Sequence, residues 1–361
     1  MQELKDKVLA LLYDHALHSK NRGRGEYLSG EEAAQSLHVS RNAVWKAIEE
    51  LRDDGCPLDA ASRKGYRLTA AVPYLSAVAI NAHLGRFHPI TVLTETDSTN
   101  RQLMRMADEG AEEGTIVIAE SQTEGRGRLG RQFVSPPGTG IYMSFLLRPK
   151  SSAAQAVRIT TAAAVAVSDA IESCTGEKTE IKWVNDIFIR GKKVCGILTE
   201  GAVDVESGGV RYAVLGIGIN VCPPMEGFPP EIAEIAGCVT QRYVPELRNK
   251  LAAAVIGNFF REYNRWNYRD PARSERIHDD PCYLSYRRRM FLLGKLVKIL
   301  PAGEQNARVE YGVCVDLDRD YRLIVEVEEN GKKVLRTLSS GEVSVLPTQH
   351  PGEQMNNTAK D

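Results

Sequence analysis

The pattern of apolar and polar residues changes twice along the chain. Residues 1 to about 70 show short helical patterns followed by a hairpin. Residues about 75 to 280 alternate apolar runs with long helical patterns, and residues about 281 to 350 show strand-like runs only. Proline-containing segments near residues 73 and 281 separate these parts. We therefore expect three domains, over residues 1–70, 75–280 and 281–350.

The middle part contains more strands than helices. Two segments, 152–173 and 244–266, have helical spacing, and Leu247, Leu251, Val255 and Phe259 share one face of the second. Several strand-like runs follow each other directly, which favours an α+β fold with a mixed sheet over strict β-α-β winding. The strand-like runs cover residues 90–96, 114–121, 140–149, 180–189, 192–203 and 211–221.

The N-terminal part begins with signals for a pair of helices. Ser29 and Glu32 have the spacing of a capping box, which predicts a helix start. Ser40 is placed to cap a second helix, which Gly55 ends. Apolar residues share one face of this second helix and polar residues the other. The apolar set is Val44, Ile48 and Leu51, and the other set is Arg41, Asn42, Trp45 and Lys46.

These helices and the following hairpin, CPLDAASRKGYRL, have the pattern of a winged helix-turn-helix. In such domains the second helix enters the major groove of DNA and the wing contacts the backbone. A module that binds protein, or only packs, is the alternative, because residues 1–70 hold eleven basic and eleven acidic residues. Arg67 also lies near the hairpin tip. The residues expected to contact DNA are Arg41, Asn42, Trp45, Lys46, Arg63 and Lys64.

The stretch GRGRLGR, residues 125–131, satisfies the dinucleotide pattern G-x-G-x-x-G. Pro136 and Pro137 exclude the helix that a dinucleotide fold requires after the loop, and no acid stands about twenty residues later. A kinase glycine loop is excluded because Gln132 occupies the required Val position. Three arginines among three glycines instead favour a phosphate or carboxylate site. A solvated basic turn is the alternative.

Four further motifs place polar residues or glycines beside strands, and each has a structural alternative. Ser98 or Thr99 in ETDSTN can cap a helix, and the Asn-Asp pair of KWVNDI can form a turn. Lys193 in KKVCGILTE can be a surface lysine, and GIGIN, residues 216–220, can be a β-bulge.

Composition narrows the class of protein. Hydrophobic residues make up 43% of the 361 residues, enough for a sizeable core, and the net charge of −1 indicates neither nucleic acid nor membrane. The charged N-terminus does not resemble a signal peptide, and no apolar run reaches the roughly 18 residues of a membrane span. Seven cysteines without C-x-x-C spacing favour reduced thiols. We therefore expect a cytoplasmic protein.

Taken in order, DSTN, SQTEGRGRLGR, KWVNDI, KVCGI and GIGIN resemble the catalytic domain of biotin protein ligases. The resemblance covers residues about 90 to 220. It implies a mixed sheet like that of class II synthetases, followed by an SH3-like β-barrel that suits the strand-like runs between residues 290 and 346. Three residues depart from the family's usual pattern, namely Leu129, Val184 and Cys195. These departures concern the fine tuning of the site and not the resemblance itself. With the winged helix-turn-helix, the resemblance implies a bifunctional ligase and repressor.

The reaction implied by the resemblance has two steps. The biotin carboxylate attacks the α-phosphate of ATP to give biotinyl-5′-AMP and pyrophosphate, with Mg²⁺ as the implied cofactor. A lysine of the biotin carboxyl carrier protein of acetyl-CoA carboxylase, or of another biotin-accepting domain, then attacks the adenylate and releases AMP. The adenylate is also the implied corepressor, which favours a homodimer on operator DNA and represses biotin synthesis genes.

The resemblance also assigns residues. Lys193, Arg126 and Arg128 are the implied catalytic residues. The implied biotin-binding residues are Ser98, Thr99, Asn100, Gln122, Arg126, Gly127, Arg128 and Lys193. The implied ATP and adenylate residues are Arg128, Arg131, Lys182, Asn185, Asp186 and Asn220, with Asp186 as the Mg²⁺ ligand. Trp183 is implied to wall the biotin ring, and residues 223–240 resemble a loop that closes over the adenylate.

Two other functions stay open. A DNA-binding sensor could bind biotin or its adenylate without ligation, and a lipoate-type ligase shares the same catalytic superfold. Lys193 and the complete GRGRLGR loop argue against the first, and the winged helix with the full motif set argues against the second.

Overall fold

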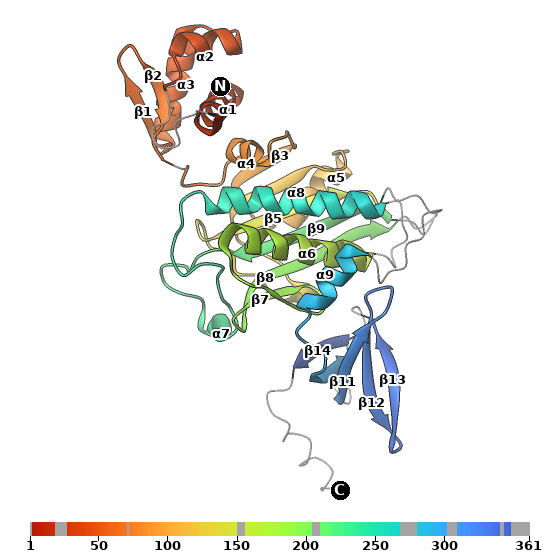
Figure 1. The fold of residues 1–361 in the computed structure, drawn as a ribbon. Helices are drawn as coiled ribbons and strands as arrows, with labels where there is room; N and C mark the ends of the chain where they lie inside the picture. The colour runs from red at the N-terminus through yellow and green to blue at the C-terminus, as the bar shows by residue number, and fades with distance from the viewer. Residues whose placement is uncertain are drawn as a thin grey trace.

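The computed structural model describes residues 2–18, 27–70, 72–149, 156–203, 210–267, 280–301, 309–339 and 343–347. In chain order they form a helical part, a central sheet covered by helices, and a C-terminal sheet (Figure 1). The predicted α+β class is confirmed.

The N-terminal part has the predicted helices and hairpin. Ser29 and Ser40 cap their helices, but the Ser29 side chain accepts its hydrogen bond from the Glu31 N–H and not within a box with Glu32. Gly55 follows the last helix with φ 84°, a left-handed conformation that suits glycine. The elements are α1 (Gln2–His18), α2 (Gly30–Leu37), α3 (Arg41–Asp53), β1 (Leu58–Ala61) and β2 (Gly65–Leu68).

The apolar face of α3 forms the core of this part. Val44, Ile48 and Leu51 are buried, as predicted, in one cluster with Val8 and Leu12 of α1. This packing leaves the opposite face of α3 toward solvent.

The central sheet has seven strands in the order β3-β4-β5-β9-β8-β7-β6. The β3–β4 pair is parallel and every other neighbouring pair is antiparallel, so the predicted mixed sheet is confirmed. The strands are β3 (Ile90–Thr96), β4 (Ile116–Gln122), β5 (Gly140–Leu147), β6 (Glu180–Lys182), β7 (Asp186–Ile189), β8 (Lys192–Val203) and β9 (Val210–Asn220).

Helices cover the two faces of this sheet unequally. On one face, α6 (Ala156–Thr175) and α8 (Leu247–Asn267) lie over alternate residues of β5 such as Met143 and Phe145, and α4 (Ala77–Leu84) packs on α8 (Figure 1). On the other face, α5 (Thr99–Asp108) packs Leu103 against Leu146. Successive strand residues point to opposite faces of the sheet. The part of the second face that α5 does not cover is therefore not occupied by α6 or α8.

Two sequence expectations are wrong in the central part and at its end. The pattern predicts one strand over 180–189, but residues 183–185 form a turn between β6 and β7. Residues 281–289, expected as the start of an all-β part, form α9 (Pro281–Arg289). Asp280 caps this helix and Pro281 occupies its first position, and both are helix-start signals. The sequence pattern also missed α4 and the short α7 (Pro230–Ala233).

The C-terminal sheet is antiparallel throughout, in the order β13-β12-β11-β10-β14. The last part of the strand-like region, residues 331–346, contains two strands, β13 and β14, which lie at opposite edges of the sheet. The strands are β10 (Leu296–Pro301), β11 (Glu310–Leu317), β12 (Leu323–Glu329), β13 (Lys332–Leu338) and β14 (Val343–Pro347).

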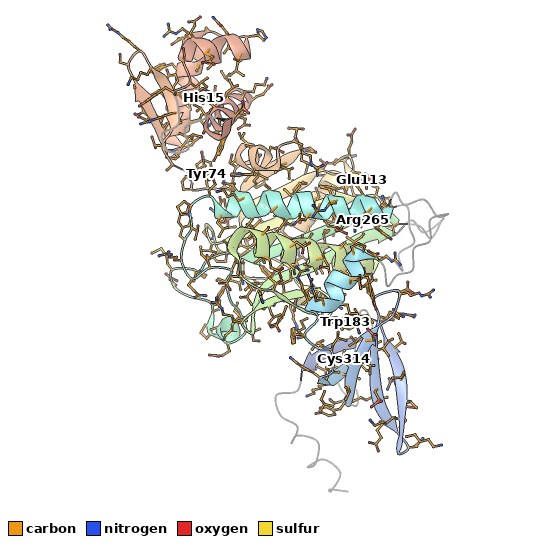
Figure 2. All side chains as sticks on the ribbon, viewed as in Figure 1. His15, Tyr74, Glu113, Trp183, Arg265 and Cys314 are labelled. Atoms are coloured by element: carbon orange, nitrogen blue, oxygen red, sulfur yellow. The ribbon has the colours of Figure 1, made fainter. Side chains whose placement is uncertain are left out.

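The turn after β6 ties the C-terminal part to the central sheet. The Trp183 Nε1–H donates to the Tyr321 carbonyl at 2.8 Å, and the Tyr286 hydroxyl donates to the Val184 carbonyl at 3.1 Å. Both bonds are buried, and Trp183 lies at the junction of the two parts (Figure 2).

An ion cluster fixes α9 to α6. Arg289 donates to Glu172 and Asp169, and the Thr179 hydroxyl donates to Glu172 at 2.6 Å. Burial raises the pKa of Glu172, but the hydrogen bonds from Arg289 and Thr179 outweigh burial and lower the pKa to about 2.

We expect Glu172→Gln to lower the free energy of unfolding at pH 7 by about 2 kcal/mol, because the variant loses the charge that Arg289 stabilises. The folded-state pKa lies below the unfolded value, so this stabilisation is present above about pH 4.5 and is lost as the pH falls toward 2. Urea unfolding at pH 7 and pH 3 measures the difference between the variant and the wild type. The exposed Glu231→Gln serves as control, and a difference that does not shrink at pH 3 would contradict the assignment.

Candidate active site

Three glycines open the second face of the central sheet. A Cβ atom at Gly216 would lie 2.3 Å from Asn100 Oδ1, and one at Gly218 would lie 2.5 Å from the Phe133 ring. At Gly196 the nearest Phe133 atom would be 3.2 Å away. Glycine therefore lets Asn100 and Phe133 rest directly on the strands. The β-bulge alternative for GIGIN is wrong, because β9 keeps regular register with β5 and β8 over these residues.

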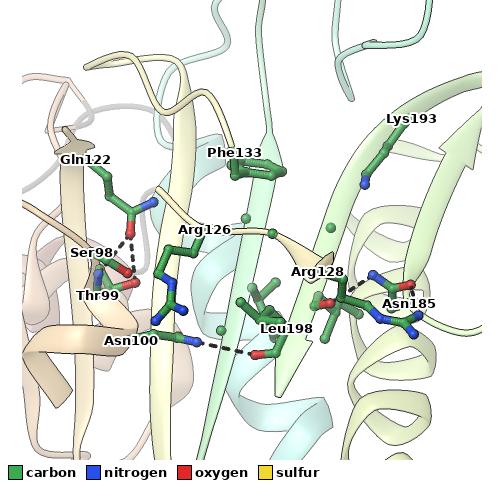
Figure 3. Close-up of a pocket in the computed structure, with 16 residues that line it drawn as sticks. Ser98, Thr99, Asn100, Gln122, Arg126, Arg128, Phe133, Asn185, Lys193 and Leu198 are labelled. Atoms are coloured by element: carbon green, nitrogen blue, oxygen red, sulfur yellow. Dashed lines mark hydrogen bonds between the residues drawn. The ribbon is translucent and has the colours of Figure 1, made fainter. Parts of the chain in front are cut away.

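A pocket lies on this glycine floor, and we call it the first pocket (Figure 3). Phe133 and Leu198 are among the residues that line it. All eight residues expected to bind biotin also line it, namely Ser98, Thr99, Asn100, Gln122, Arg126, Gly127, Arg128 and Lys193.

The turn that presents residues 98–100 is held by Asp97. Its carboxylate accepts from the Ser98 N–H at 2.7 Å and from two Arg105 nitrogens at 2.9 Å each. These hydrogen bonds, led by the one from Arg105, hold the pKa of Asp97 well below its usual range. Ser98 stands at the N-cap of α5, but its side chain makes no capping bond, so the capping interpretation is wrong. The buried Ser98 lines the first pocket instead.

Polar side chains are linked at this end of the first pocket. The Thr99 N–H and hydroxyl both donate to Gln122 Oε1, at 2.9 and 3.1 Å, and Gln122 Nε2 donates to Ser135 at 2.8 Å. The Ser144 hydroxyl lies 2.6 Å from Asn100 Oδ1. This network fixes which donors and acceptors a ligand would meet.

The GRGRLGR loop folds back on itself. The Gly127 N–H donates to the Arg131 carbonyl at 2.7 Å, and Leu129 adopts φ 56°. A Cβ at Gly125 would lie 2.2 Å from the Phe133 carbonyl, so this position requires glycine. Residues 131–139 form no helix, as the exclusion of a dinucleotide fold predicts.

The three arginines of the loop have different surroundings. Arg126 Nη1 lies 3.0 Å from Glu200 Oε1, and Arg128 Nη1 donates to Asn185 Oδ1 at 3.0 Å. Burial lowers the pKa of Arg128. Arg131 is exposed at a second pocket. The solvated-turn alternative is therefore wrong for the half-buried Arg128, whereas Arg126 is exposed to solvent but pairs with Glu200.

The second pocket adjoins the first and has a volume of about 300 Å³. Lys193 Nζ lies 2.7 Å from Asp186 Oδ1 in it, and burial lowers the pKa of Lys182. The pocket contains every residue expected to bind ATP, namely Arg128, Arg131, Lys182, Asn185, Asp186 and Asn220.

The two pockets share a boundary. Lys193 belongs to it, so the surface-lysine alternative is wrong. Asn185 belongs to it too and lies in the turn over residues 183–185, which was the structural alternative for KWVNDI. The residues that line both pockets are Gly127, Arg128, Phe133, Asn185 and Lys193. Ligands in the two pockets would therefore meet beside the ammonium of Lys193 and the guanidinium of Arg128.

Trp183 differs from its expected position, and Phe133 was missed by the sequence analysis. Trp183 lines the second pocket and not the first, and its indole donates to Tyr321, so it does not wall the first pocket as expected. The segment 223–240 contributes Phe228, Ile232 and Ile235 to the second pocket. Phe133 carried no sequence signal, because its position depends on glycines far along the chain.

A groove between α3 and the hairpin contains five of the six residues expected to contact DNA. Lys46 is exposed but does not line this groove. Arg67 is not free at the tip, because it pairs with Asp59 at 3.0 Å and lies over the Tyr27 ring. The residues in the groove are Arg41, Asn42, Trp45, Arg63 and Lys64.

The described residues contain neither a metal-binding cluster nor a membrane-spanning helix. No group of three or more His, Cys, Asp or Glu side chains among them could hold a metal ion. None of the helices described is both long and apolar enough to cross a membrane.

The chain thus combines two adjoining pockets on one sheet face with a separate helix-turn-helix. The model of the biotin/lipoate A/B protein ligase family matches residues 92–220, and a helix-turn-helix domain model matches residues 21–67. The chain belongs to the biotin/lipoate A/B protein ligase family.

Named relatives agree with this assignment. The chain is 43% identical over 219 residues to the bifunctional ligase/repressor BirA of Bacillus spizizenii, covering 60% of this chain and 67% of that protein. It is 30% identical over 260 residues to the biotin–[acetyl-CoA-carboxylase] ligase of Mycobacterium tuberculosis, covering 70% and 88%. The structure of the Aquifex aeolicus biotin protein ligase in complex with biotin and ATP is similar, with TM-score 0.58, 28% identity, and coverage of 73% and 100%.

We expect Gly216→Ala to lower the free energy of unfolding by about 1–3 kcal/mol, because the new methyl group overlaps Asn100. Gly257→Ala in α8 is the matched control. Its methyl group would meet only a flexible Leu84 atom at 3.3 Å, and the helix gains about 0.5–1 kcal/mol. Urea unfolding compares the two variants, and equal stabilities would show that Asn100 does not rest on residue 216.

Proposed function

We propose that this chain is an ATP-dependent biotin–protein ligase and a biotin-responsive repressor of biotin synthesis genes. The observation that carries the ligase function is the boundary between the pockets, where Lys193 and Arg128 face both ligands. Membership of the biotin/lipoate A/B protein ligase family and the Mycobacterium tuberculosis relative, which is named as a biotin–[acetyl-CoA-carboxylase] ligase, support biotin as the substrate.

Biotin fits the first pocket by its chemistry. Its ureido edge can exchange hydrogen bonds with Ser98, Thr99 and Gln122, and the glycine floor can pack against its apolar rings. Its carboxylate then points to the boundary beside Arg128 and Lys193. Cations placed in advance lower the cost of bringing a carboxylate to a phosphate, so catalysis rests on positioning and electrostatics.

ATP fits the second pocket, where Lys182, Arg131 and Asn220 can contact it. Attack of the biotin carboxylate on the α-phosphate forms an acyl–phosphate bond, breaks the α–β phosphoanhydride bond and releases pyrophosphate. Asp186 Oδ1 lies 2.7 Å from Lys193 Nζ, and this ion pair keeps the ammonium at the boundary between the two pockets.

Mg²⁺ is the proposed cofactor. It usually binds through one or two carboxylates together with substrate phosphates, so the single carboxylate of Asp186 fits such a site only when ATP is present. Bound there, the ion would neutralise charge on the pyrophosphate leaving group.

The second half-reaction needs no nucleophile from the enzyme. The amine of an acceptor lysine attacks the biotinyl carbonyl, an amide forms, and AMP leaves. The acceptors we propose are the biotin carboxyl carrier protein of acetyl-CoA carboxylase and other biotin-accepting domains. These partners, ATP and the seven free cysteines suit a cytoplasmic location.

The groove between α3 and the hairpin is the proposed operator-binding surface. Helix residues such as Asn42 and Trp45 would face base edges, while Arg63 and Lys64 would contact phosphates. Biotinyl-5′-AMP is the proposed corepressor, and a homodimer would place two such surfaces on two half-sites. The family and its bifunctional relatives support this combination.

Biotin-dependent ATP–pyrophosphate exchange tests the ligase function. We expect exchange with biotin and none with lipoate, and we expect Lys193→Ala to slow it at least a hundredfold by removing charge at the reacting atoms. Lys192→Ala, which changes the neighbouring lysine outside both pockets, should keep the wild-type rate. Exchange with lipoate alone, or a wild-type rate in Lys193→Ala, would contradict the proposal.

Binding of duplex DNA at several salt concentrations tests the repressor function. We expect Lys64→Ala to weaken binding and to reduce the slope of log affinity against log salt by about one, because one phosphate contact is lost. Lys7→Ala on α1, which also removes an exposed lysine, should change neither quantity. Fluorescence anisotropy with biotin and ATP present measures the affinity and the salt slope. Equal affinities and slopes for the two variants would argue against the groove as the operator-binding surface.

A further inference from the structure

Glu200 connects two residues of the first pocket without lining the pocket itself. It lies on β8 two residues after Leu198, so both side chains point to the same sheet face. Its Oε1 lies 3.0 Å from Arg126 Nη1, and its Oε2 accepts from Asn100 Nδ2 at 2.8 Å. Each carboxylate oxygen thus holds one pocket residue.

Asn100, which anchors Glu200, is held rigidly. Asn100 is 4% exposed, rests on Gly216 and has its Oδ1 2.6 Å from the Ser144 hydroxyl, which is fully buried. Glu200 therefore receives its hydrogen bond from an amide that cannot turn away. The fixed carboxylate in turn sets the direction of the Arg126 side chain, which points toward Asn100 (Figure 3).

Arg126 needs such a partner. It lies on the exposed GRGRLGR loop with 41% of its side chain accessible, whereas Glu200 is 20% exposed. A long side chain on a loop loses rotamer freedom when it binds a ligand, and this entropy cost opposes binding. A carboxylate that holds the guanidinium beforehand reduces that cost and leaves other N–H donors of the fork for the ligand.

We propose that Glu200 is a positioning residue that holds Arg126 ready to donate hydrogen bonds to biotin at the end of the first pocket where Asn100 lies. The inference rests on the proposed ligase function and adds a specific role for a residue outside both pockets. A carboxylate suits this role because both oxygens accept hydrogen bonds. In a glutamine an NH2 group replaces one of these oxygens, and this group would face the donor of either Arg126 or Asn100.

The test is Glu200→Gln in the full chain, measured by biotin-dependent ATP–pyrophosphate exchange. We expect the KM for biotin to rise about tenfold, in line with the loss of one charge-assisted hydrogen bond, and the KM for ATP to stay within about twofold. Calorimetric titration with biotin should show the same loss of affinity without turnover.

An Arg126→Ala background separates positioning from general damage. In this background Glu200→Gln should cause no further rise in the KM for biotin, because the positioned group is already absent. Glu200→Asp keeps the charge and should fall between the wild type and Glu200→Gln. Glu326→Gln, which removes a carboxylate 2.7 Å from Lys333 on the C-terminal sheet, should keep wild-type constants.

The outcomes distinguish this inference from the proposed function. An unchanged or lower KM for biotin in Glu200→Gln, or equal effects with and without Arg126, would overturn the role of Glu200 while the wild type still exchanges. A wild-type protein that neither binds biotin nor exchanges would instead overturn the proposed function. A lowered melting temperature in Glu200→Gln with full effect in the Arg126→Ala background would indicate a structural role and also overturn the inference.

Discussion

Close approach between side chains and the backbone of β8 and β9 shapes the site. Asn100 and Phe133 occupy space that Cβ atoms at Gly216 and Gly218 would fill. The helices α6 and α8 pack on the opposite face, so the hydrophobic core and the pockets use different sides of the same strands. The core thus supports a rigid floor without competing with the pockets for space.

Three cations of the site are held by counter-charges or polar partners in the protein. Asp186 pairs with Lys193, Asn185 accepts from Arg128, and Glu200 pairs with Arg126. Without these partners, the positively charged side chains would repel one another and turn toward solvent. The partners come from β7, β8 and the turn before β7, so this part of the sheet orients Arg126 and Arg128, which belong to a loop, as well as Lys193 of β8.

Local signals in the sequence predict much of this structure. Ser40 and Gly55 mark the ends of α3, and the strand-like runs become β3, β4, β5, β8 and β9. The ordered motifs also supply every residue expected to bind biotin or ATP, and each lines the first or second pocket. Contacts between distant segments were not predictable. Phe133 lies over glycines more than 60 residues away, Trp183 turns toward Tyr321, and Glu200 reaches back to Asn100 and Arg126.

The hydrogen bond from Trp183 to Tyr321 has a consequence for modular evolution. A chimaera that joins this central sheet to an unrelated C-terminal module must offer a carbonyl where that of Tyr321 now lies. Without it, a buried indole N–H loses its acceptor beside the second pocket, at a cost of about 1–3 kcal/mol. This hydrogen bond therefore favours inheritance of the central and C-terminal parts together, whereas in the described residues the apolar core of the helix-turn-helix is a cluster separate from the one that contains Trp183 and Tyr321.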